Sequence, residues 1–211
     1  MEKLHDMLVE YNTHYVPINC RSSWSKQFME AKFPKYWEIV FKELYPLDKN
    51  LKVIEIGCGQ GDVTSILCYL GFYNVRAYEM DSLMSKIAAN KIEQIFGRTK
   101  IVMCSQYPAL QEIADILILV NCAYADGCSN KEDYLRKLVL YFDKANRPKL
   151  FLLEVIDSEY KIPDEEFPDC LRLNSDDIKA TFPQAYIYSY ITYKYPQNKR
   201  TKKLYIIRHT K

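Results

Sequence analysis

The feature that most constrains this chain is a regular alternation, from residue 51 onward, of short apolar runs and segments with helical spacing. The apolar runs predict strands at 51–57, 74–81, 99–105, 115–121 and 149–155. The segments with helical spacing predict helices at 62–70, 82–96, 130–142 and 175–182. Strands that alternate with helices imply βαβ units and a parallel sheet, and right-handed crossovers place helices on both faces of that sheet.

The C-terminal end departs from this alternation. Residues 185–193 and 203–210 are two further strand patterns, and the nine residues between them leave no room for a helix. We therefore expect an antiparallel hairpin at the sheet edge. The predicted fold class is α/β, with a seven-stranded, mostly parallel sheet that ends in this hairpin.

The composition fits one globular domain and excludes several classes of protein. The chain has 211 residues and a formal net charge of +2, so it lacks the strongly basic balance of a dedicated nucleic-acid binder. No segment has the pattern of a signal peptide or a membrane span. Seven cysteines are scattered singly without a CxxC pair, which argues against a disulfide framework and a zinc site and favours reduced thiols in a cytoplasmic protein.

The most informative stretch is the glycine-rich loop between the first predicted strand and the helix after it, with the sequence VIEIGCGQG over residues 53–61. Glycines allow a sharp turn and the close approach of a ligand, and a helix N-terminus offers unpaired N–H groups. A dinucleotide-binding loop places its third glycine five residues after the first. Asp62 holds that position here and would face a pyrophosphate with negative charge, so the spacing disfavours a nicotinamide cofactor.

This stretch resembles motif I of the class I S-adenosylmethionine-dependent methyltransferases, in which an acid and one further residue precede G-x-G-x-G. The pattern is matched in full by one acid and three glycines, Glu55, Gly57, Gly59 and Gly61. The resemblance implies a Rossmann-like methyltransferase core over residues 51–211. It also implies that the loop, with Cys58, wraps the aminoacyl part of S-adenosylmethionine and that Glu55 reaches its ammonium group, directly or through water. The competing interpretation is a tight turn that binds no ligand.

A second acidic residue supports the resemblance. Glu79 ends the second predicted strand, 22 residues after the first glycine of the loop, and a carboxylate about 20 residues on can accept hydrogen bonds from both ribose hydroxyls. Asp81 is the reserve for this role, and Met80 would lie beside the adenine. After the third strand the family often has an acid against the adenine amino group, whereas this chain has Ser105 and Gln106, either of which could make that hydrogen bond.

The loop after the fourth strand, residues 121–127, is expected next to the transferred methyl group, because ligands in open α/β sheets bind beyond the carboxyl ends of the strands. Asn121 is a further candidate contact of the cofactor. With Tyr124 it faintly resembles the N-P-P-Y motif of methyltransferases that modify amide or exocyclic nitrogens, although both prolines are missing; otherwise Asn121 only ends the strand and Tyr124 packs the pocket wall. Asp126 and His14 are the candidate bases for a hydroxyl acceptor.

The first 50 residues are expected to form an N-terminal helical lid and acceptor-binding segment ahead of the core. Helical spacing over residues 22–45, interrupted by Pro34, predicts two helices there. Four aromatic side chains either line an apolar pocket or pack this lid onto the sheet: Tyr11, Tyr15, Trp24 and Trp37.

Three further features are interpreted as ordinary surface. The hairpin tip is expected to be a solvated turn, with phosphate binding as the alternative, and its basic residues are Lys194, Lys199, Arg200, Lys202 and Lys203. A run of acids is also expected in solvent, at Asp164, Glu165 and Glu166. His209 follows an antiparallel last strand and is expected at the surface.

These features favour an S-adenosylmethionine-dependent methyltransferase acting on oxygen or nitrogen of a small-molecule acceptor, since no added recognition domain is visible. No metal site is indicated, and the oligomeric state is open. One alternative is methylation of RNA, DNA or protein, favoured by the basic tip and residues 121–124. The other is a non-catalytic module that binds an adenosyl ligand, favoured by the missing acid after the third strand.

Overall fold

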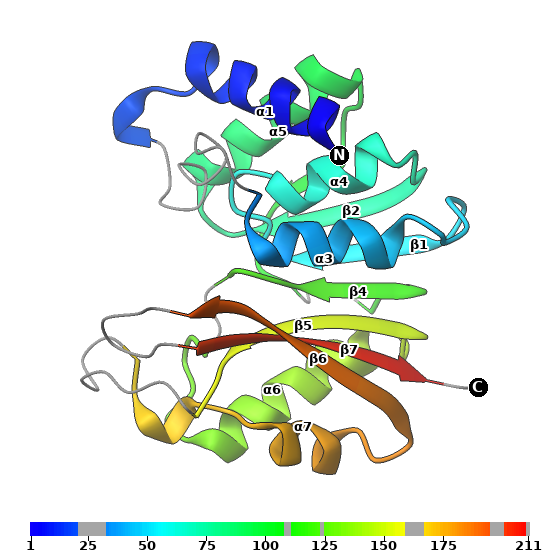
Figure 1. The fold of residues 1–211 in the computed structure, drawn as a ribbon, viewed down its shortest axis with the longest axis vertical. Coiled ribbons are helices and arrows are strands. Elements are labelled where there is room, and N and C mark those ends of the chain that lie inside the picture. The colour runs from blue at the N-terminus through cyan, green and yellow to red at the C-terminus, as the bar shows by residue number, and fades with distance from the viewer. Residues whose placement is uncertain (21–32, 108–110, 123–124, 159–166, 195–200, 210–211) are drawn as a thin grey trace. The chain divides into compact units, whose positions relative to one another are not determined.

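A computed structural model describes residues 1–20, 33–107, 111–122, 125–158, 167–194 and 201–209 of the chain. The chain folds as two compact units, Met1–Ala109 and Leu110–Lys211 (Figure 1). The boundary between them follows the third strand. The predicted division at residue 50, between a lid and a core, is a different one and stays a prediction.

The first unit contains three parallel strands, with the second in the middle: β1 (Lys52–Ile56), β2 (Asn74–Glu79) and β3 (Val102–Cys104). The crossover helices are α4 (Asp62–Tyr69) and α5 (Ser82–Phe96). Gly71 and Gly97 have left-handed φ values of +87° and +66° just beyond these helices, so the helices end where the sequence predicts.

The described N-terminal residues form two α-helices and a 3-10 helix: α1 (Glu2–Tyr15), η1 (Ile18–Cys20) and α3 (Lys35–Leu44). Helix α1 packs on α4 and α5, and α3 packs on α4. Pro34 is the N-cap of α3, so the break predicted at this proline is confirmed. The helix predicted before Pro34 lies mostly outside the described residues, and so does Trp24. Tyr11 and Trp37 are buried, whereas Tyr15 is exposed.

The second unit contains four strands, β4 (Ile116–Leu119), β5 (Leu150–Ile156), β6 (Ala185–Lys194) and β7 (Thr201–His209). Strand β5 is parallel to β4 and antiparallel to β7, and β7 pairs with β6 in the predicted hairpin. The helical elements are α6 (Lys131–Lys144), the 3-10 helix η2 (Asp169–Leu171) and α7 (Ser175–Thr181). Asn130 and Asn174 cap α6 and α7 by accepting hydrogen bonds from backbone N–H groups of the first turn.

The predicted fold class is confirmed. The strands follow the order β3-β2-β1-β4-β5-β7-β6, a seven-stranded mixed sheet with parallel strands and an antiparallel C-terminal hairpin. Every residue of β4 and β5 is buried, which explains their unbroken apolar runs, since a strand covered on both faces has no reason to alternate.

The prediction that His209 lies at the surface is only partly right, because the residue is half-buried. The centroid of its ring lies 4.7 Å from that of Phe142 in α6 and 6.1 Å from that of Phe182 at the end of α7. Burial lowers the pKa of His209, and the charge of Arg147 lowers it further. The last strand therefore places this ring against the aromatic side chains of Phe142 and Phe182.

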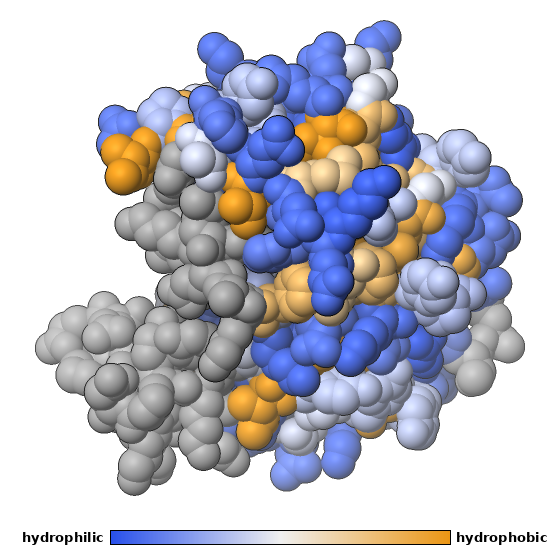
Figure 2. Space-filling model, turned by 45° about the horizontal axis from the view of Figure 1, so that its top comes forward, coloured by the Kyte–Doolittle hydropathy of each residue, from blue (hydrophilic) through white to orange (hydrophobic). Residues whose placement is uncertain are grey.

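The surface seen in Figure 2 is mostly hydrophilic, with small apolar patches between polar and charged residues. Scattered apolar side chains such as Tyr73 and Tyr186 are exposed, as is usual for a folded surface. No helix among the described residues combines the length and the apolarity needed to cross a membrane.

Candidate functional site

The glycine loop joins β1 to α4 and turns sharply through left-handed backbone conformations. The φ values of its glycines are +67°, +55° and +80° for Gly57, Gly59 and Gly61. The N–H of Cys58 donates to the carbonyl of Tyr78 at 3.0 Å, which ties the loop to β2. A Cβ on Gly61 would lie 3.1 Å from the Cβ of Ala88 in α5. The loop therefore requires glycine both for its turn and for its close approach to α5.

Glu79, at the end of β2, holds this loop through its carboxylate. Its Oε2 accepts a hydrogen bond from the N–H of Gly59 at 2.8 Å, and its Oε1 accepts one from the N–H of Asp81 at 2.9 Å. Each carboxylate oxygen keeps a second lone pair, so two adjacent hydroxyl groups can still donate to it. Asp81, the reserve candidate, is the N-cap of α5 and accepts from the N–H of Met84 at 2.8 Å.

Glu55 lies in β1, two residues before the first glycine of the loop, and is 2% exposed. Its Oε2 accepts a hydrogen bond from the hydroxyl of Thr64 in α4 at 2.6 Å. Burial raises the pKa of Glu55 to about 8; the Thr64 hydrogen bond opposes this rise, and the charges of Asp62 and Glu79 add to it. The carboxyl group is therefore mostly protonated at neutral pH, and a positive charge placed beside it would favour its ionised form.

The N-terminal segment touches the loop region at two points. The side-chain amide of Gln60, which is buried, donates to the carbonyl of Cys20 in η1. The indole N–H of Trp37 in α3 donates to the carbonyl of Asp62 at 3.1 Å. These contacts bring the segment predicted as a lid against the glycine loop and the start of α4.

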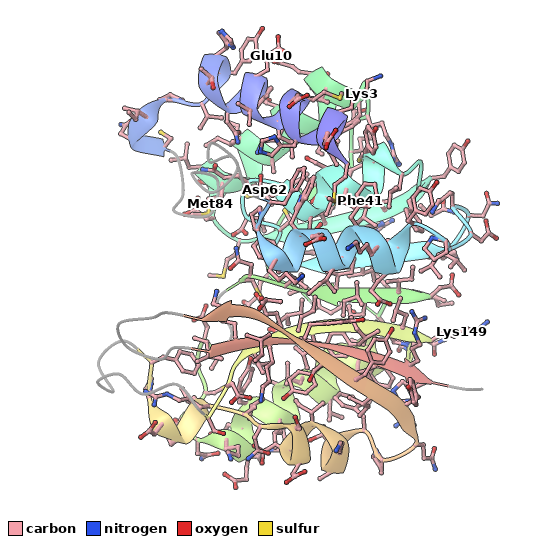
Figure 3. All side chains as sticks on the ribbon, in the orientation of Figure 1. Lys3, Glu10, Phe41, Asp62, Met84 and Lys149 are labelled. Atoms are coloured by element: carbon pink, nitrogen blue, oxygen red, sulfur yellow. The ribbon has the colours of Figure 1, made fainter. Side chains whose placement is uncertain are left out.

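The sequence interpretation missed a buried ion pair beside the loop. Asp62 is the first residue of α4 (Figure 3). Its carboxylate lies 3.0 Å from Nζ of Lys91 in α5, whose side chain is fully buried. This pair explains why an acid occupies the position where a dinucleotide loop has glycine, because its carboxylate forms an ion pair with Lys91 of α5. The available signal was that Lys91 falls on the buried face of α5, beside Ala88 and Ile92.

The residues predicted to surround the adenine follow two adjacent strand ends. Because Glu79 pairs with Cys104 in the parallel register, Met80 and Ser105 come next at the same level. Met80 is 66% exposed, Ser105 is half-buried and Gln106 is exposed. Their contacts with a ligand stay predictions.

In the second unit, Asn121 follows β4 with a left-handed φ of +54°. Its backbone N–H donates to Oε2 of Glu154 at 3.0 Å, and its Oδ1 accepts from Nζ of Lys202 at 2.9 Å. Glu154 is fully buried, and its Oε1 accepts from the hydroxyl of Thr192. We call Asn121, Glu154, Thr192 and Lys202 the Asn121 cluster.

The candidate bases occupy exposed positions. Asp126 is exposed, and its carbonyl accepts a hydrogen bond from Nζ of Lys137. His14 is exposed in the last turn of α1, where its Nδ1 lies 2.9 Å from the carbonyl of Glu10. Tyr124 lies outside the described residues.

The prediction of a solvated hairpin tip is wrong for two of its five basic residues. Lys202 and Lys203 belong to β7, and adjacent residues of a strand face opposite sides. Lys202 donates to Asn121, while Nζ of Lys203 lies 3.0 Å from Oδ2 of the fully buried Asp157. Residues outside the described part of the chain include Lys199, Arg200, Asp164, Glu165 and Glu166, and also the side chain of Lys194.

Comparison with known proteins identifies the fold of this chain. No protein-family model matches the chain, and no curated protein matches its sequence. A magnesium protoporphyrin IX methyltransferase from Synechocystis, solved with bound S-adenosylhomocysteine, is 14% identical with a TM-score of 0.65, over 96% of this chain and 99% of that chain. The chain has the fold of a class I methyltransferase.

Two further solved structures agree on this fold. A putative RNA methyltransferase from Pyrococcus horikoshii is 14% identical with a TM-score of 0.60, over 100% of this chain and 99% of that one. An S-adenosylmethionine-dependent methyltransferase from Clostridium acetobutylicum is 14% identical with a TM-score of 0.58, over 96% and 97% of the two chains. The methyltransferase fold that motif I implies is therefore confirmed. The names of the Synechocystis and Pyrococcus proteins give different acceptors, a porphyrin and RNA.

Proposed function

We propose that the protein binds S-adenosylmethionine at the glycine loop of the first unit and transfers its methyl group to oxygen or nitrogen of a small-molecule acceptor. The observation that carries this proposal is the Glu79 carboxylate, which two backbone N–H groups hold in one orientation beside the loop. A carboxylate held in this way is prepared to accept two hydrogen bonds from a vicinal diol, because its remaining lone pairs point away from the backbone donors.

Three features of this site suit the cofactor. The glycine loop offers backbone without Cβ atoms for a close approach, Glu79 suits the ribose diol, and the buried Glu55 suits an ammonium group. When bound, S-adenosylmethionine supplies a methyl group that is already electrophilic on its sulfonium. The residues of the chain then have to bind the cofactor and the acceptor, align them and exclude water, since alignment supplies much of the rate of such a transfer.

The relatives of similar fold support this cofactor. The Synechocystis methyltransferase was solved both with bound S-adenosylmethionine and with bound S-adenosylhomocysteine. A nucleic-acid acceptor finds less support in this chain, because Lys202 and Lys203 of the basic tip are engaged by Asn121 and Asp157.

Calorimetric titration tests the proposal, with S-adenosylmethionine, S-adenosylhomocysteine and NAD as ligands. We expect both adenosyl ligands to bind and NAD not to bind. Glu79→Gln should weaken the adenosyl ligands about 100-fold, since it replaces an acceptor of two charge-assisted hydrogen bonds.

Asp81→Asn is the matched control, because asparagine also caps a helix and leaves Glu79 in place. It should change the affinity by less than about threefold, well below the effect of one hydrogen bond to a charged group. Tight NAD binding, or a larger loss in Asp81→Asn than in Glu79→Gln, would contradict the assignment. Binding without turnover on any acceptor would point to the non-catalytic adenosyl-binding module instead.

A further inference from the structure

The outer edge of β6, in the second unit, is exposed and uncharged. Strand β6 is the last in the order β3-β2-β1-β4-β5-β7-β6, so among the described residues no other strand pairs with its far edge. Such an edge presents a row of backbone N–H and C=O groups to any other extended chain. Proteins usually protect an edge with lysine, proline, a bulge or an inward-facing charge, and residues 185–191 contain none of these. This edge is therefore open to pairing.

Three tyrosines form a row on one face of this edge strand. Tyr186, Tyr188 and Tyr190 alternate along β6, so they face the same side of the sheet. The ring centroids lie 5.6 Å apart for the first two tyrosines and 5.8 Å apart for the last two. The first is 68% exposed and the last is 39% exposed, although large aromatic side chains stabilise a structure most when they are buried. We call these three residues the tyrosine ladder.

A β-bulge limits the regular part of the edge. The pairing of β6 with β7 shifts between Ile191 and Tyr193, which leaves Thr192 as the extra residue, and this residue is buried. A bulge bends its strand and interrupts regular pairing, so the regular part of the free edge runs from the start of β6 to the bulge, over residues 185–191. Tyr188 lies at the centre of this part.

We propose that two copies of the chain pair through β6, antiparallel and related by a two-fold axis at Tyr188. Ala185 of one copy then lies opposite Ile191 of the other, so the regular part of each edge is used in full. Tyr186 lies opposite Tyr190, and Tyr188 lies opposite its own equivalent. Both tyrosine ladders therefore share one face, and aromatic pairs at directly opposite positions stabilise antiparallel strands. Because the contact uses the same edge of both copies, it closes after two chains.

Charge favours a second copy over other extended partners. Residues 185–191 are uncharged and the whole chain has a net charge of only +2, so two copies meet with little repulsion. A single-stranded nucleic acid can stack its bases on tyrosines, but it also needs cations for its phosphates, and these residues supply none. A foreign peptide matches the ladder only if it has aromatic residues at every second position. A second copy has them by symmetry.

Analytical ultracentrifugation of the full chain, from about 1 μM to about 1 mM, tests the pairing. We expect a monomer–dimer equilibrium without larger species. Tyr186→Lys with Tyr190→Lys places like charges opposite each other at two positions, so it should weaken the dimer at least about tenfold. Tyr186→Lys with Tyr190→Glu is the matched control, because it removes the same tyrosines but places lysine opposite glutamate. Its dimer should be at least about tenfold tighter than that of the double lysine variant.

Cysteine variants test the register independently. Directly opposite residues of antiparallel strands have Cα atoms about 4.5–5.5 Å apart, which a disulfide can span. With oxidised glutathione as the oxidant, Tyr188→Cys should therefore form a disulfide between two copies. Tyr186→Cys and Tyr190→Cys should each form one only when the two variants are mixed. Mass spectrometry of the cross-linked peptides, with the wild type as control, separates these bonds from any that the native cysteines form.

A wild-type chain that stays monomeric up to about 1 mM would overturn the proposal, and so would open-ended assemblies, since a two-fold contact uses up the edge. Equal dimer affinities in the two charge variants, or no cross-link in a folded Tyr188→Cys protein, would place the interface elsewhere and overturn it too. A monomer that binds a single-stranded oligonucleotide or a peptide along β6 would assign the edge to that partner instead. Circular dichroism checks that each variant is folded.

The pairing involves the second unit alone and does not depend on the proposed function. Titration of S-adenosylhomocysteine into the same samples tests that function separately, so either conclusion can fail while the other stands.

Discussion

The two units differ in the partners of the buried acids near their strand ends. In the first unit, Glu55 is held by a hydroxyl group and Glu79 by backbone N–H groups, and within the described residues neither forms an ion pair. In the second unit, Nζ of Lys203 lies 3.0 Å from Oδ2 of Asp157, while Glu154 accepts hydrogen bonds from the backbone N–H of Asn121 and the hydroxyl of Thr192. The second unit therefore neutralises Asp157 with a lysine of its own, whereas the first leaves two carboxyl groups beside the glycine loop that a cationic ligand can neutralise.

One acid of the first unit is paired with a lysine, as Asp157 is in the second unit. Asp62 is adjacent to the glycine loop, yet its charge is taken up by the buried Lys91. The presence of a lysine partner is therefore the criterion that distinguishes an acid that stabilises the fold from one that is available to a ligand. On this criterion Glu55 and Glu79 are the available acids, and the following predictions test that distinction.

The largest expected effect is a pH-dependent loss of stability that comes from Glu55. Its pKa is raised from 4.5 to about 8 in the folded protein, so the folded chain keeps a proton that the unfolded chain releases between these values. The stabilising contribution is complete below pH 4.5 and is lost as the pH rises through 8. The loss is about 1.4 kcal/mol per pH unit, or roughly 4 kcal/mol between pH 5 and pH 8.

Urea unfolding of the wild type and of Glu55→Gln over this range measures the effect, since glutamine cannot titrate. Subtracting the two curves removes the contribution of all other groups. Parallel curves for the two proteins would show that Glu55 ionises normally and that the comparison between the units fails at this residue.

A somewhat smaller effect is expected where an acid of the second unit loses its lysine. Lys203→Met leaves the carboxylate of Asp157 buried without its cation and should destabilise the chain by about 3 kcal/mol. The double variant with Asp157→Asn should recover most of this loss, because no buried charge remains. A single variant as stable as the wild type would mean that Asp157 does not depend on its cation.

Ligand binding should show a pH dependence of opposite sign to that of stability. If the ammonium group of S-adenosylhomocysteine contacts Glu55, its affinity rises by up to about tenfold per pH unit and levels off above about pH 8. Thr64→Val removes the hydrogen bond that lowers the pKa of Glu55, so its plateau should begin at a higher pH. Calorimetry at several pH values checks both curves, and a flat wild-type profile would place the ammonium group elsewhere.

The sequence predicts the fold and the glycine loop well because both depend on local signals. Unbroken apolar runs mark β4 and β5, whose residues are all buried. Left-handed glycines mark the loop and the ends of α4 and α5. Each of these signals can be interpreted within a few residues of the chain, so distant partners are not needed.

Buried charges were the part that the sequence did not predict. Lys91 resembles any lysine on a helix until Asp62, 29 residues earlier, is brought against it. Lys202 and Lys203 resemble part of a turn in the sequence, because β7 begins before its apolar residues. The partners of these two lysines are Asn121, after β4, and Asp157, just after β5. Their burial depends on pairing between distant strands, which local spacing does not contain.

The smallest expected effect separates the two units at a pair of glycines. Gly61 and Gly127 have similar left-handed φ values, +80° and +75°. Among the described residues only Gly61 has a close neighbour, since a Cβ there would lie 3.1 Å from the Cβ of Ala88. Gly127→Ala should therefore cost about 1 kcal/mol for its backbone alone. Gly61→Ala should cost roughly 1 kcal/mol more, because the loop must also shift away from α5.

Adding Ala88→Gly tests the origin of that difference by urea unfolding. It removes the atom that the new methyl group meets, so it should reduce the extra cost in Gly61→Ala while leaving the backbone cost in place. The same shift of the loop would move the N–H of Gly59 away from Glu79, so Gly61→Ala should also weaken S-adenosylhomocysteine, whereas Gly127→Ala should not. Equal stability losses with equal ligand affinities would mean that the close packing of the loop on α5 has no part in holding Glu79, and that the carboxylate keeps its orientation by its backbone donors alone.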